Sequence, residues 1–316
     1  MPARFFCNPP RLLACLLCFL AASGVSRAQT PPDAAALATR RLAWHWEAGK
    51  RYLFQTETET IINLKALDKE GEQVLQVIQN TDITVRPGKD AGTKELKVRF
   101  VTLRARMAAE GKTFLYDSEE PSDSHPALRQ MLADSSGTGF TLIYSEDDQF
   151  LKIGAVDQPA ALPDTDPSLL QVADARQVAE LYRRSLEMVL PRPEVAVGDK
   201  WTSIEQMTFP QAGDMDVRMN CHYLENLDRD SRRHAKITFQ GRLGQAVSSA
   251  GGEDHRTLKL GGDSTIAGHI FYDLDRRAVS LSMFLGSIVI NHDGKNLPVR
   301  QSVTTRLEDI VEAPAS

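Results

Sequence analysis

A strict alternation of side-chain type over residues 52–62 constrains the fold more than any other feature of the sequence. Aromatic, aliphatic and threonine side chains occupy the even positions, whereas Gln55, Glu57 and Glu59 occupy odd positions between them. Successive side chains of a β-strand point to opposite faces of its sheet. The alternation therefore predicts a strand with one covered face and one wet face, which is typical of an antiparallel sheet.

A second strand-like run, residues 94–108, contains a change of phase. Leu96, Val98 and Phe100 share one face, and the apolar positions then move to Val101 and Leu103. Moving the apolar set by one residue requires a β-bulge, which bends the strand. Because long strands with bulges suit strongly curved sheets, we predict a mainly β fold built as a curved antiparallel sheet or half-barrel.

One long helical pattern, residues 168–190, interrupts the strands, and a shorter one is expected at residues 126–133. Pro191 and Pro193 end the long pattern. Its i, i+3, i+4 stripe predicts a buried face made of Val178, Leu181, Tyr182, Ser185 and Val189. Its charged residues are predicted to face solvent; they are Arg176, Glu180, Arg183, Arg184 and Glu187.

Two short segments are similar in sequence, EAGKRYLF at residues 47–54 and AVGDKWTS at residues 196–203. In each, a glycine (Gly49 or Gly198) supplies a turn just before an aromatic strand begins. This similarity predicts two related β-rich halves joined by the long helix. The predicted boundaries are residues 1–28 for a leader, 29–43 for a lead-in, 44–190 for the first half with its helix at 168–190, and 191–316 for the second half.

The first 28 residues have the layout of a signal peptide. Arg4 and Arg11 accompany an apolar run at residues 12–25, and Ser26-Arg27-Ala28 forms a small-x-small cleavage signal. The apolar run is too short to anchor the chain in a bilayer, so we expect no transmembrane segment in the mature chain. We predict an exported protein, periplasmic or extracellular after cleavage following Ala28.

Loss of the leader changes the charge and the cysteine count. The 37 basic residues fall to 34 against 42 acidic residues, so the net charge moves from −5 to −8. A net acidic chain without a basic cluster is a poor match for nucleic acid, and we expect no nucleic-acid partner. Lipidation at Cys15 is disfavoured, because the apolar run has barely begun there. Cys221 then remains as the single cysteine, which excludes an intrachain disulfide.

No grouping of residues in the sequence indicates catalysis, a metal or a cofactor. The histidines lie one per predicted strand or turn, without an H-x-x-x-H or H-E-x-x-H pair. No G-x-S-x-G motif is present, and Cys221 lies in a strand-like run where a buried, inert thiol is expected. We therefore predict a protein that is not an enzyme, with no metal site and no cofactor.

Several short motifs are spread over most of the chain after the leader. They are Trp46-x-x-Gly49-x-x-Tyr52-x-Phe54, Tyr116-Asp117-Ser118, Gly139-Phe140-Thr141-Leu142, Leu190-Pro191-x-Pro193-x-Val195-x-Val197-Gly198-Asp199-x-Trp201, and Tyr223. Their order resembles an uncharacterised family of exported bacterial proteins, defined only as a domain of unknown function. The resemblance implies no catalytic residues, because that family has none assigned.

One position departs from the pattern of this family. Asp148 stands in the hairpin where glycine is expected, which bears on the type of turn. The layout also resembles, at the level of the fold, the curved half-barrels of lipoprotein carriers, and such a likeness says nothing about function by itself.

Five aromatic residues are candidates for the lining of an apolar pocket: Trp46, Tyr52, Phe54, Trp201 and Tyr182. The alternative interpretation is that they are ordinary core. The first hypothesis for function is an exported non-catalytic protein that binds an apolar small molecule or an envelope protein in a curved sheet. The alternative is a structural or assembly protein of the cell envelope without a pocket. A hydrolase assembled from distant residues is the least favoured hypothesis.

Overall fold

The structure is a computed structural model that describes residues 38–67, 71–132, 137–157, 175–209, 213–245, 259–292 and 294–314. Within these ranges, 13 strands form one sheet in the order β6-β5-β3-β2-β1-β13-β12-β11-β9-β8-β7, with β4 beside β3 and β10 beside β12. The strands are β1 Lys50–Asn63, β2 Glu72–Pro87, β3 Thr93–Ala109, β4 Lys112–Asp117, β5 Gly139–Ser145, β6 Phe150–Val156, β7 Lys200–Phe209, β8 Gly213–Arg229, β9 Arg232–Gln245, β10 Lys259–Leu260, β11 Thr265–Asp273, β12 Ala278–His292 and β13 Lys295–Glu312. The helices are α2 Pro126–Leu132 and α3 Ala175–Glu187, with short 3-10 turns at Leu64–Leu67 and Pro121–Asp123.

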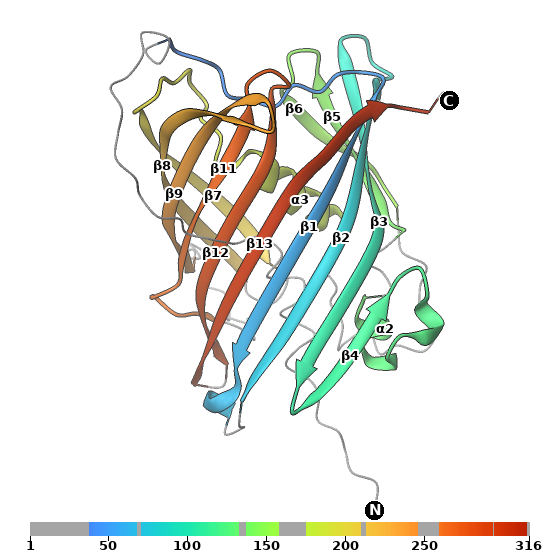
Figure 1. Cartoon of the computed structure of the whole chain (residues 1–316), viewed down its shortest axis with the longest axis vertical. Coiled ribbons are helices and arrows are strands. Elements are labelled where there is room, and N and C mark those ends of the chain that lie inside the picture. Colours follow the sequence, from blue (N-terminus) through green and yellow to red (C-terminus); the bar gives the residue numbers. More distant parts are fainter. Residues whose placement is uncertain are drawn as a thin grey trace, which may run out of the picture.

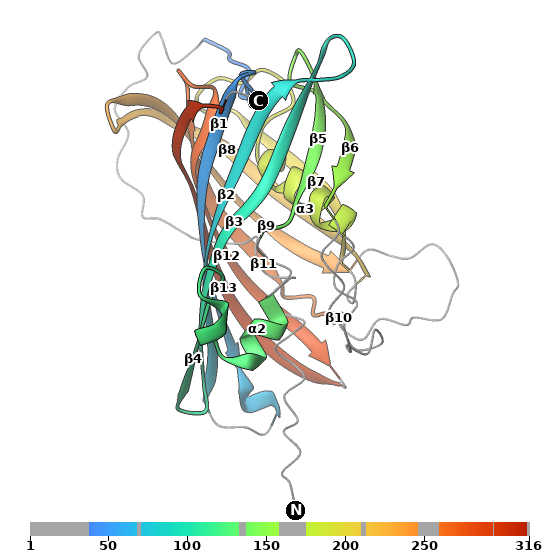
Figure 2. The same cartoon turned by 90° about the vertical axis from the view of Figure 1, so that its right-hand side faces the viewer.

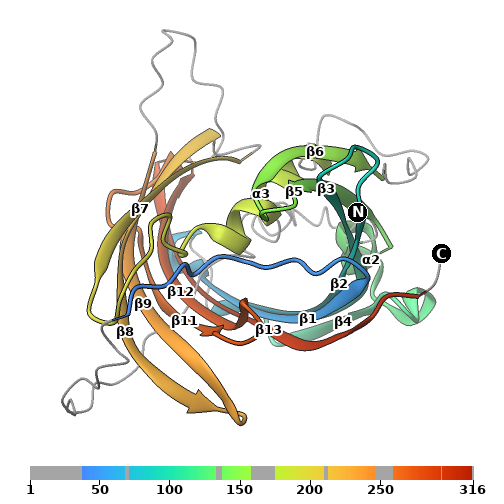
Figure 3. The same ribbon diagram turned by 90° about the horizontal axis from the view of Figure 1, so that it is seen from above.

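The sheet is antiparallel, strongly curved and open (Figure 1). Seen from above, the strands form a trough, and α3 lies on its concave side, between β5 and β6 on one wall and β7 on the other (Figure 3). α3 lies toward the upper end of the trough, whereas α2 and β4 lie toward the lower end (Figure 2). The edge strands β6 and β7 do not pair with each other, so the sheet does not close. The predicted curved antiparallel sheet is thus confirmed.

The predicted bulge is confirmed in β3. Asn80 of β2 pairs with Thr102, and the next residue, Thr81, pairs with Phe100. Val101 is therefore the extra residue, at the position where the apolar pattern changes phase. Further register shifts leave an extra residue in β13 opposite β1, in β8 opposite β9 and in β12 opposite β11. Because each bulge adds local twist and bend, they account for the curvature of strands this long.

The strands before and after α3 belong to one continuous sheet. β1 and β13 join the two blocks of strands through an antiparallel ladder that runs from Lys50–Glu312 to Ile62–Val299. α3 ends at Glu187, three residues before the predicted end, because Leu190 donates its N–H to Glu187 O in a tighter turn that Pro191 follows. Residues 168–174 and the predicted leader lie outside the described residues, and the division into domains stays a prediction.

Buried side chains gather in three clusters. The first, called here the aromatic cluster, contains Trp44, Trp46, Tyr52, Phe54 and Tyr144 with aliphatic residues of β2, β3 and β5. The second covers β7 to β13 and includes Leu181, Met188 and Val189 at the end of α3. The third lies between α2, β3 and β4. The helices therefore cover the two ends of the concave face.

We expect Gly198→Ala to lower the free energy of unfolding by about 1 kcal/mol, because alanine disfavours the positive φ that glycine adopts there. Gly198 has φ 97° and donates its N–H to Tyr223 O at 2.7 Å, so the backbone is held in this conformation. Urea unfolding measures the change. Gly262→Ala is the control, since no atom lies within 4 Å of the added Cβ and its φ is not positive. Equal losses in the two variants would contradict the argument.

Candidate functional site

A segment without regular structure, residues 38–49, crosses the open end of the trough and is called here the strap (Figure 3). At its first end, Arg40 and Val195 exchange backbone hydrogen bonds of 2.8 and 2.9 Å. In its middle, Tyr272 donates its hydroxyl to Ala43 O at 2.6 Å, and His45 donates its N–H to Arg277 O. The strap is thereby attached to β11 and to two connecting segments that follow α3 in the sequence.

The other end of the strap is attached to the carboxylate of Asp148. Asp148 Oδ1 accepts the N–H of Trp46 at 3.0 Å and Lys94 Nζ at 2.6 Å, and Oδ2 lies 2.8 Å from His45 Nδ1. Lys94 Nζ also donates to Trp46 O at 2.8 Å. The Asp148 side chain is only 6% exposed, so its charge depends on these partners.

Asp148 does more than set the turn type. It has φ 62°, which an aspartate tolerates better than most residues other than glycine. Glycine at this position would supply the turn but no carboxylate for the strap. An aspartate in place of the glycine expected in this hairpin is therefore the signal in the sequence that could have indicated the attachment.

Three of the five predicted pocket residues lie together in the aromatic cluster. Trp46, Tyr52 and Phe54 are each at most 5% exposed. The ring of Trp46 stacks on Trp44 at a centroid distance of 4.6 Å and meets the Tyr52 ring edge-on at 5.0 Å. These contacts are those of a packed core.

Of the other two predicted residues, one lies on α3 and one on β7. Tyr182 of α3 makes edge contacts with Phe100 and Phe140 and packs against the aromatic cluster. Trp201 of β7 packs against the second cluster and donates its indole N–H to Val189 O at 3.2 Å. The structure thus brings four of the five residues to one cluster and places Trp201 in another.

Polar side chains, called here the polar band, occupy the part of the concave face where β1 pairs with β13, around the buried Val303 that lies opposite Thr58. It consists of Thr56, Thr58 and Thr60 on β1 and Gln301 and Thr305 on β13. The two threonines Thr56 and Thr305 share a hydrogen bond of 3.1 Å between their hydroxyls. Along β1 and β13 the apolar residues on either side of the band are Tyr52, Phe54 and Leu307 at one end and Ile62, Val299 and Leu297 at the other.

Gln301 is the residue of the polar band whose hydrogen bonding is incomplete. It is 1% exposed and donates Nε2 to Thr60 Oγ1 at 3.1 Å, but its Oε1 has no hydrogen-bond partner among the described residues. A buried polar atom left without a partner costs about 1–3 kcal/mol. The indole N–H of Trp46 is buried without a partner in the same way. The covered threonines were recognised from the alternation of β1, but the sequence gives no signal for the unpaired oxygen of Gln301.

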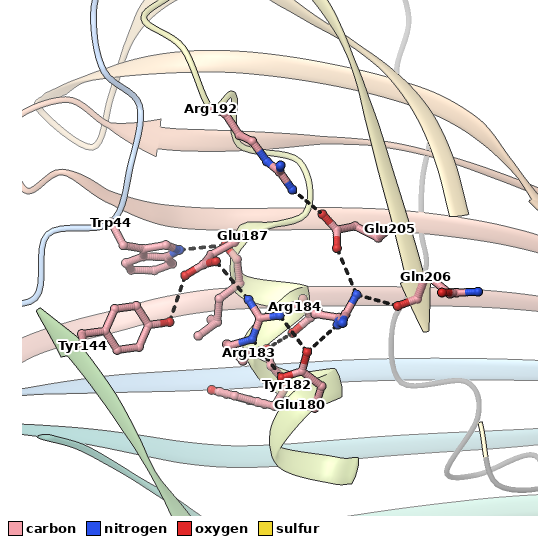
Figure 4. A network of polar contacts seen from close by, with 12 residues as sticks. Trp44, Tyr144, Glu180, Tyr182, Arg183, Arg184, Glu187, Arg192, Glu205 and Gln206 are labelled. Atoms are coloured by element: carbon pink, nitrogen blue, oxygen red, sulfur yellow. Dashed lines mark hydrogen bonds and ion pairs between the residues drawn. The ribbon is translucent and has the colours of Figure 1, made fainter. Parts of the chain in front are cut away.

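Charged residues of α3 connect the two walls of the trough (Figure 4). Toward β5, Glu187 accepts the hydroxyl of Tyr144 at 2.9 Å. Toward β7, Arg184 Nη1 lies 3.3 Å from Glu205 Oε2 and also donates to the carbonyl of Gln206. The prediction that Glu187 and Arg184 face solvent is therefore wrong, because both bind side chains of the flanking strands. It is also wrong for Arg183, which is 14% exposed and lies over the ring of Phe150 on β6.

Burial and pairing act in opposite directions on the acids of α3. Burial raises the pKa of Glu187, and the hydrogen bond from Tyr144 and the charge of Arg183 only partly offset it. Burial also acts to raise the pKa of Glu180, but hydrogen bonds and charge from Arg183 and Arg184 outweigh it and lower this pKa. Burial raises the pKa of the Tyr144 hydroxyl well above its ordinary value.

Chemistry based on a metal or a thiol finds no support in the described residues. No group of three or more histidine, cysteine, aspartate or glutamate side chains there could hold a metal ion. Cys221 is buried, and burial raises the pKa of its thiol to about 12, so the reactive thiolate is scarce at neutral pH. In the same part of the chain, every helix is too short or too polar to span a membrane.

No family model and no curated protein matches the sequence. Among solved structures, lipovitellin, from a study of its lipid–protein interactions, is similar over 86% of this chain with 14% identity and a TM-score of 0.47; the match covers 26% of the lipovitellin chain. The β domain of the Bordetella autotransporter BrkA is similar over 83% of this chain and 99% of its own, with 9% identity and a TM-score of 0.27. Both TM-scores lie below 0.5, so neither likeness determines the function of this chain.

We expect Asp148→Asn to destabilise the fold by about 3 kcal/mol, because asparagine keeps the turn but leaves the Lys94 ammonium buried without its counter-charge. Urea unfolding measures the loss, and hydrogen exchange at the Trp46 amide reports on the strap. The neighbouring exposed Asp147→Asn is the matched control and should stay within about 0.5 kcal/mol of the parent. A Trp46 amide that remains protected in Asp148→Asn would show that the strap does not depend on this carboxylate.

We expect the stability of Glu187→Gln relative to the parent to increase as the pH rises from about 4 to about 7. The pKa of Glu187 is higher in the folded protein than in the unfolded chain, so protonation of Glu187 stabilises the fold of the parent. The parent loses this stabilisation as the pH rises through the folded pKa. Glutamine does not titrate and keeps an acceptor for Tyr144. For Glu180→Gln the trend should have the opposite sign and lie mainly below pH 4.5, because the lowered pKa of Glu180 stabilises the parent above that pH and this contribution is lost as the pH falls. Urea unfolding at several pH values tests both, and parallel trends would refute the assignment.

Proposed function

We propose that this chain is an exported, non-catalytic binding protein that holds an elongated, mainly apolar ligand with one polar group against the concave face of its sheet. The observation that carries the proposal is the unpaired, buried Oε1 of Gln301 within the polar band. A hydroxyl, protonated carboxyl or amide of a ligand would donate a hydrogen bond to that oxygen and remove its cost.

The surroundings of the polar band fit the rest of such a ligand. Phe54 and Leu307 lie on one side of the band, and Ile62 and Val299 lie on the other. A ligand with an apolar chain on either side of a single polar group would match this order along the strands. Sites of this kind are mostly apolar, with a few polar groups that fix the orientation of the ligand.

A specific observation also favours a second function, that of a structural or assembly protein of the cell envelope. Trp46, Tyr52 and Phe54, which are predicted pocket residues, make the ring contacts of a solid core. If the whole concave face is packed in this way, the sheet serves as a rigid support, and its edges and loops are the surfaces that bind other components.

Native mass spectrometry of the protein, purified without detergent from the producing cells, separates the two functions. We expect an additional mass of a few hundred daltons that organic extraction releases as an amphiphilic compound. A protein that carries no small molecule and binds neither a fluorescent long-chain fatty acid nor a fluorescent long-chain alcohol would favour the structural function.

We expect Gln301→Leu to raise the thermal midpoint of the ligand-free protein, because the substitution removes a buried acceptor that has no partner. The same variant should bind the fluorescent fatty acid about tenfold more weakly, the loss expected for one hydrogen bond. Thr305→Val is the matched control, since the Thr305 hydroxyl is already bonded to Thr56. Unchanged fatty-acid binding by Gln301→Leu would remove Gln301 from the site.

A further inference from the structure

The two edges of the open sheet differ in how regularly they are built. β6 pairs with β5 through two register shifts, carries Lys152 and Gly154, and packs against α3. Bulges and lysines are devices that prevent a sheet edge from pairing with another strand. β7 also begins with a lysine, Lys200, and contacts α3, but it has no bulge. It pairs with β8 in one unbroken register from Lys200–His222 to Phe209–Gly213, with neither proline nor glycine in the strand. β7 is therefore the edge that is open to further pairing.

The backbone groups that point away from β8 follow from the ladder. Tyr223 donates its N–H to Asp199 O, so Asp199 and Tyr223 form a hydrogen-bonded pair. In an antiparallel ladder hydrogen-bonded pairs alternate along the strand, so odd-numbered residues of β7 bond to β8 and even-numbered residues direct their N–H and C=O to the free edge. The carbonyl of Gln206 accepts from the Arg184 side chain rather than from β8, in agreement with this assignment.

The side chains at this edge are suited to contact with another strand. Ile204 is 55% exposed, one of the most exposed large apolar side chains in the described part of the chain. Thr202 and Gln206, on the same face as Ile204, are exposed and uncharged. On the other face Ser203 and Glu205 are half-buried, and Glu205 lies beside Arg184.

We propose that β7 is the contact surface for a second copy of this chain, whose own β7 adds antiparallel to it across a two-fold axis, with Ile204 opposite Ile204. In this register Ile204 of each copy donates its N–H to Ile204 O of the other. Thr202 forms the next hydrogen-bonded pair with Gln206, whose carbonyl accepts from Arg184 with one lone pair and from the N–H of Thr202 with the other. Strand addition at a free edge gains its affinity from such main-chain bonds. The two curved sheets then become one continuous sheet.

The residues of β7 favour a second copy over an unrelated strand. A two-fold contact requires a surface that complements itself. With Ile204 on the axis, the exposed Ile204 side chains of the two copies contact each other. Glu205 of each copy then lies opposite Ser203 of the other copy, and not opposite a second carboxylate. Like charges directly opposite each other in a sheet are destabilising, and this register avoids them.

The dimer should dissociate on dilution. A contact through one strand edge buries less than the roughly 1,200–2,000 Å² of a standard interface, so we expect a dissociation constant in the micromolar range. Light scattering after gel filtration, over a protein concentration range of about two orders of magnitude, should show the mass rising from one chain to two.

Ile204→Lys and Leu151→Lys form a matched pair for this measurement. Leu151 is 51% exposed on β6, so the same chemical change is made at the other edge. Ile204→Lys should weaken the dimer at least about tenfold, because two ammonium groups would meet at the axis, whereas Leu151→Lys should dimerise like the parent. Circular dichroism melting verifies that both variants fold. A parent that is monomeric over the whole range, or equal weakening by both substitutions, overturns the proposal.

A single cysteine gives an independent test of the register. Opposite residues of a hydrogen-bonded pair lie about 5.5 Å apart at Cα, within the range that a disulfide bridges. Ile204→Cys, in a chain whose Cys7, Cys15 and Cys18 are replaced by serine, should form a cross-linked dimer on mild oxidation, since the remaining Cys221 is buried. Leu151→Cys in the same background should stay a monomer on a non-reducing gel. Cross-linking at position 151 and not at 204 would refute the β7 contact.

Gln301→Leu should leave the dimer unchanged, because this contact is independent of ligand binding.

Discussion

The position of the strap across the open end of the trough depends on the buried carboxylate of Asp148. An open, curved sheet leaves its concave apolar face in contact with water unless another segment crosses it. The strap does so, and it carries Trp44 and Trp46 into the aromatic cluster. Because Asp148 and Lys94 are nearly buried, only the arrangement in which they meet satisfies both charges, and that requirement fixes the position of the strap.

α3 acts in a similar way between the walls. Glu187 binds Tyr144 on one wall and Arg184 binds Glu205 on the other, so one helix sets the spacing between the two edges. A sheet held open in this manner keeps two edge strands, and the protein treats them differently. The bulges of β6 protect one edge, whereas the regular β7 leaves the other available for pairing.

The concave face and the β7 edge are the surfaces of the two proposals, ligand binding and self-association. The polar band places one unpaired acceptor, Gln301 Oε1, among apolar residues, which suits recognition of a single polar group on an otherwise apolar molecule. The β7 edge presents main-chain N–H and C=O groups and the exposed Ile204, a combination that suits pairing with another strand. Since the two proposed surfaces involve different residues, we expect the proposed ligand binding and self-association to be independent of each other.

The sequence by itself determined the strands, the covered and wet faces of β1, the bulge at Val101 and the single long helix, because alternation and helical spacing are local properties of the chain. It led to the wrong environment for Glu187 and Arg184, and it indicated only a turn at Asp148. Only the tertiary structure decided these contacts and the pairing of Gln301 with Thr60. The physical reason is distance along the chain: Trp46 and Asp148 are 102 residues apart, and Thr60 and Gln301 are 241 apart. No local pattern specifies which partner a buried polar group meets when the sheet curves and the chain returns to it.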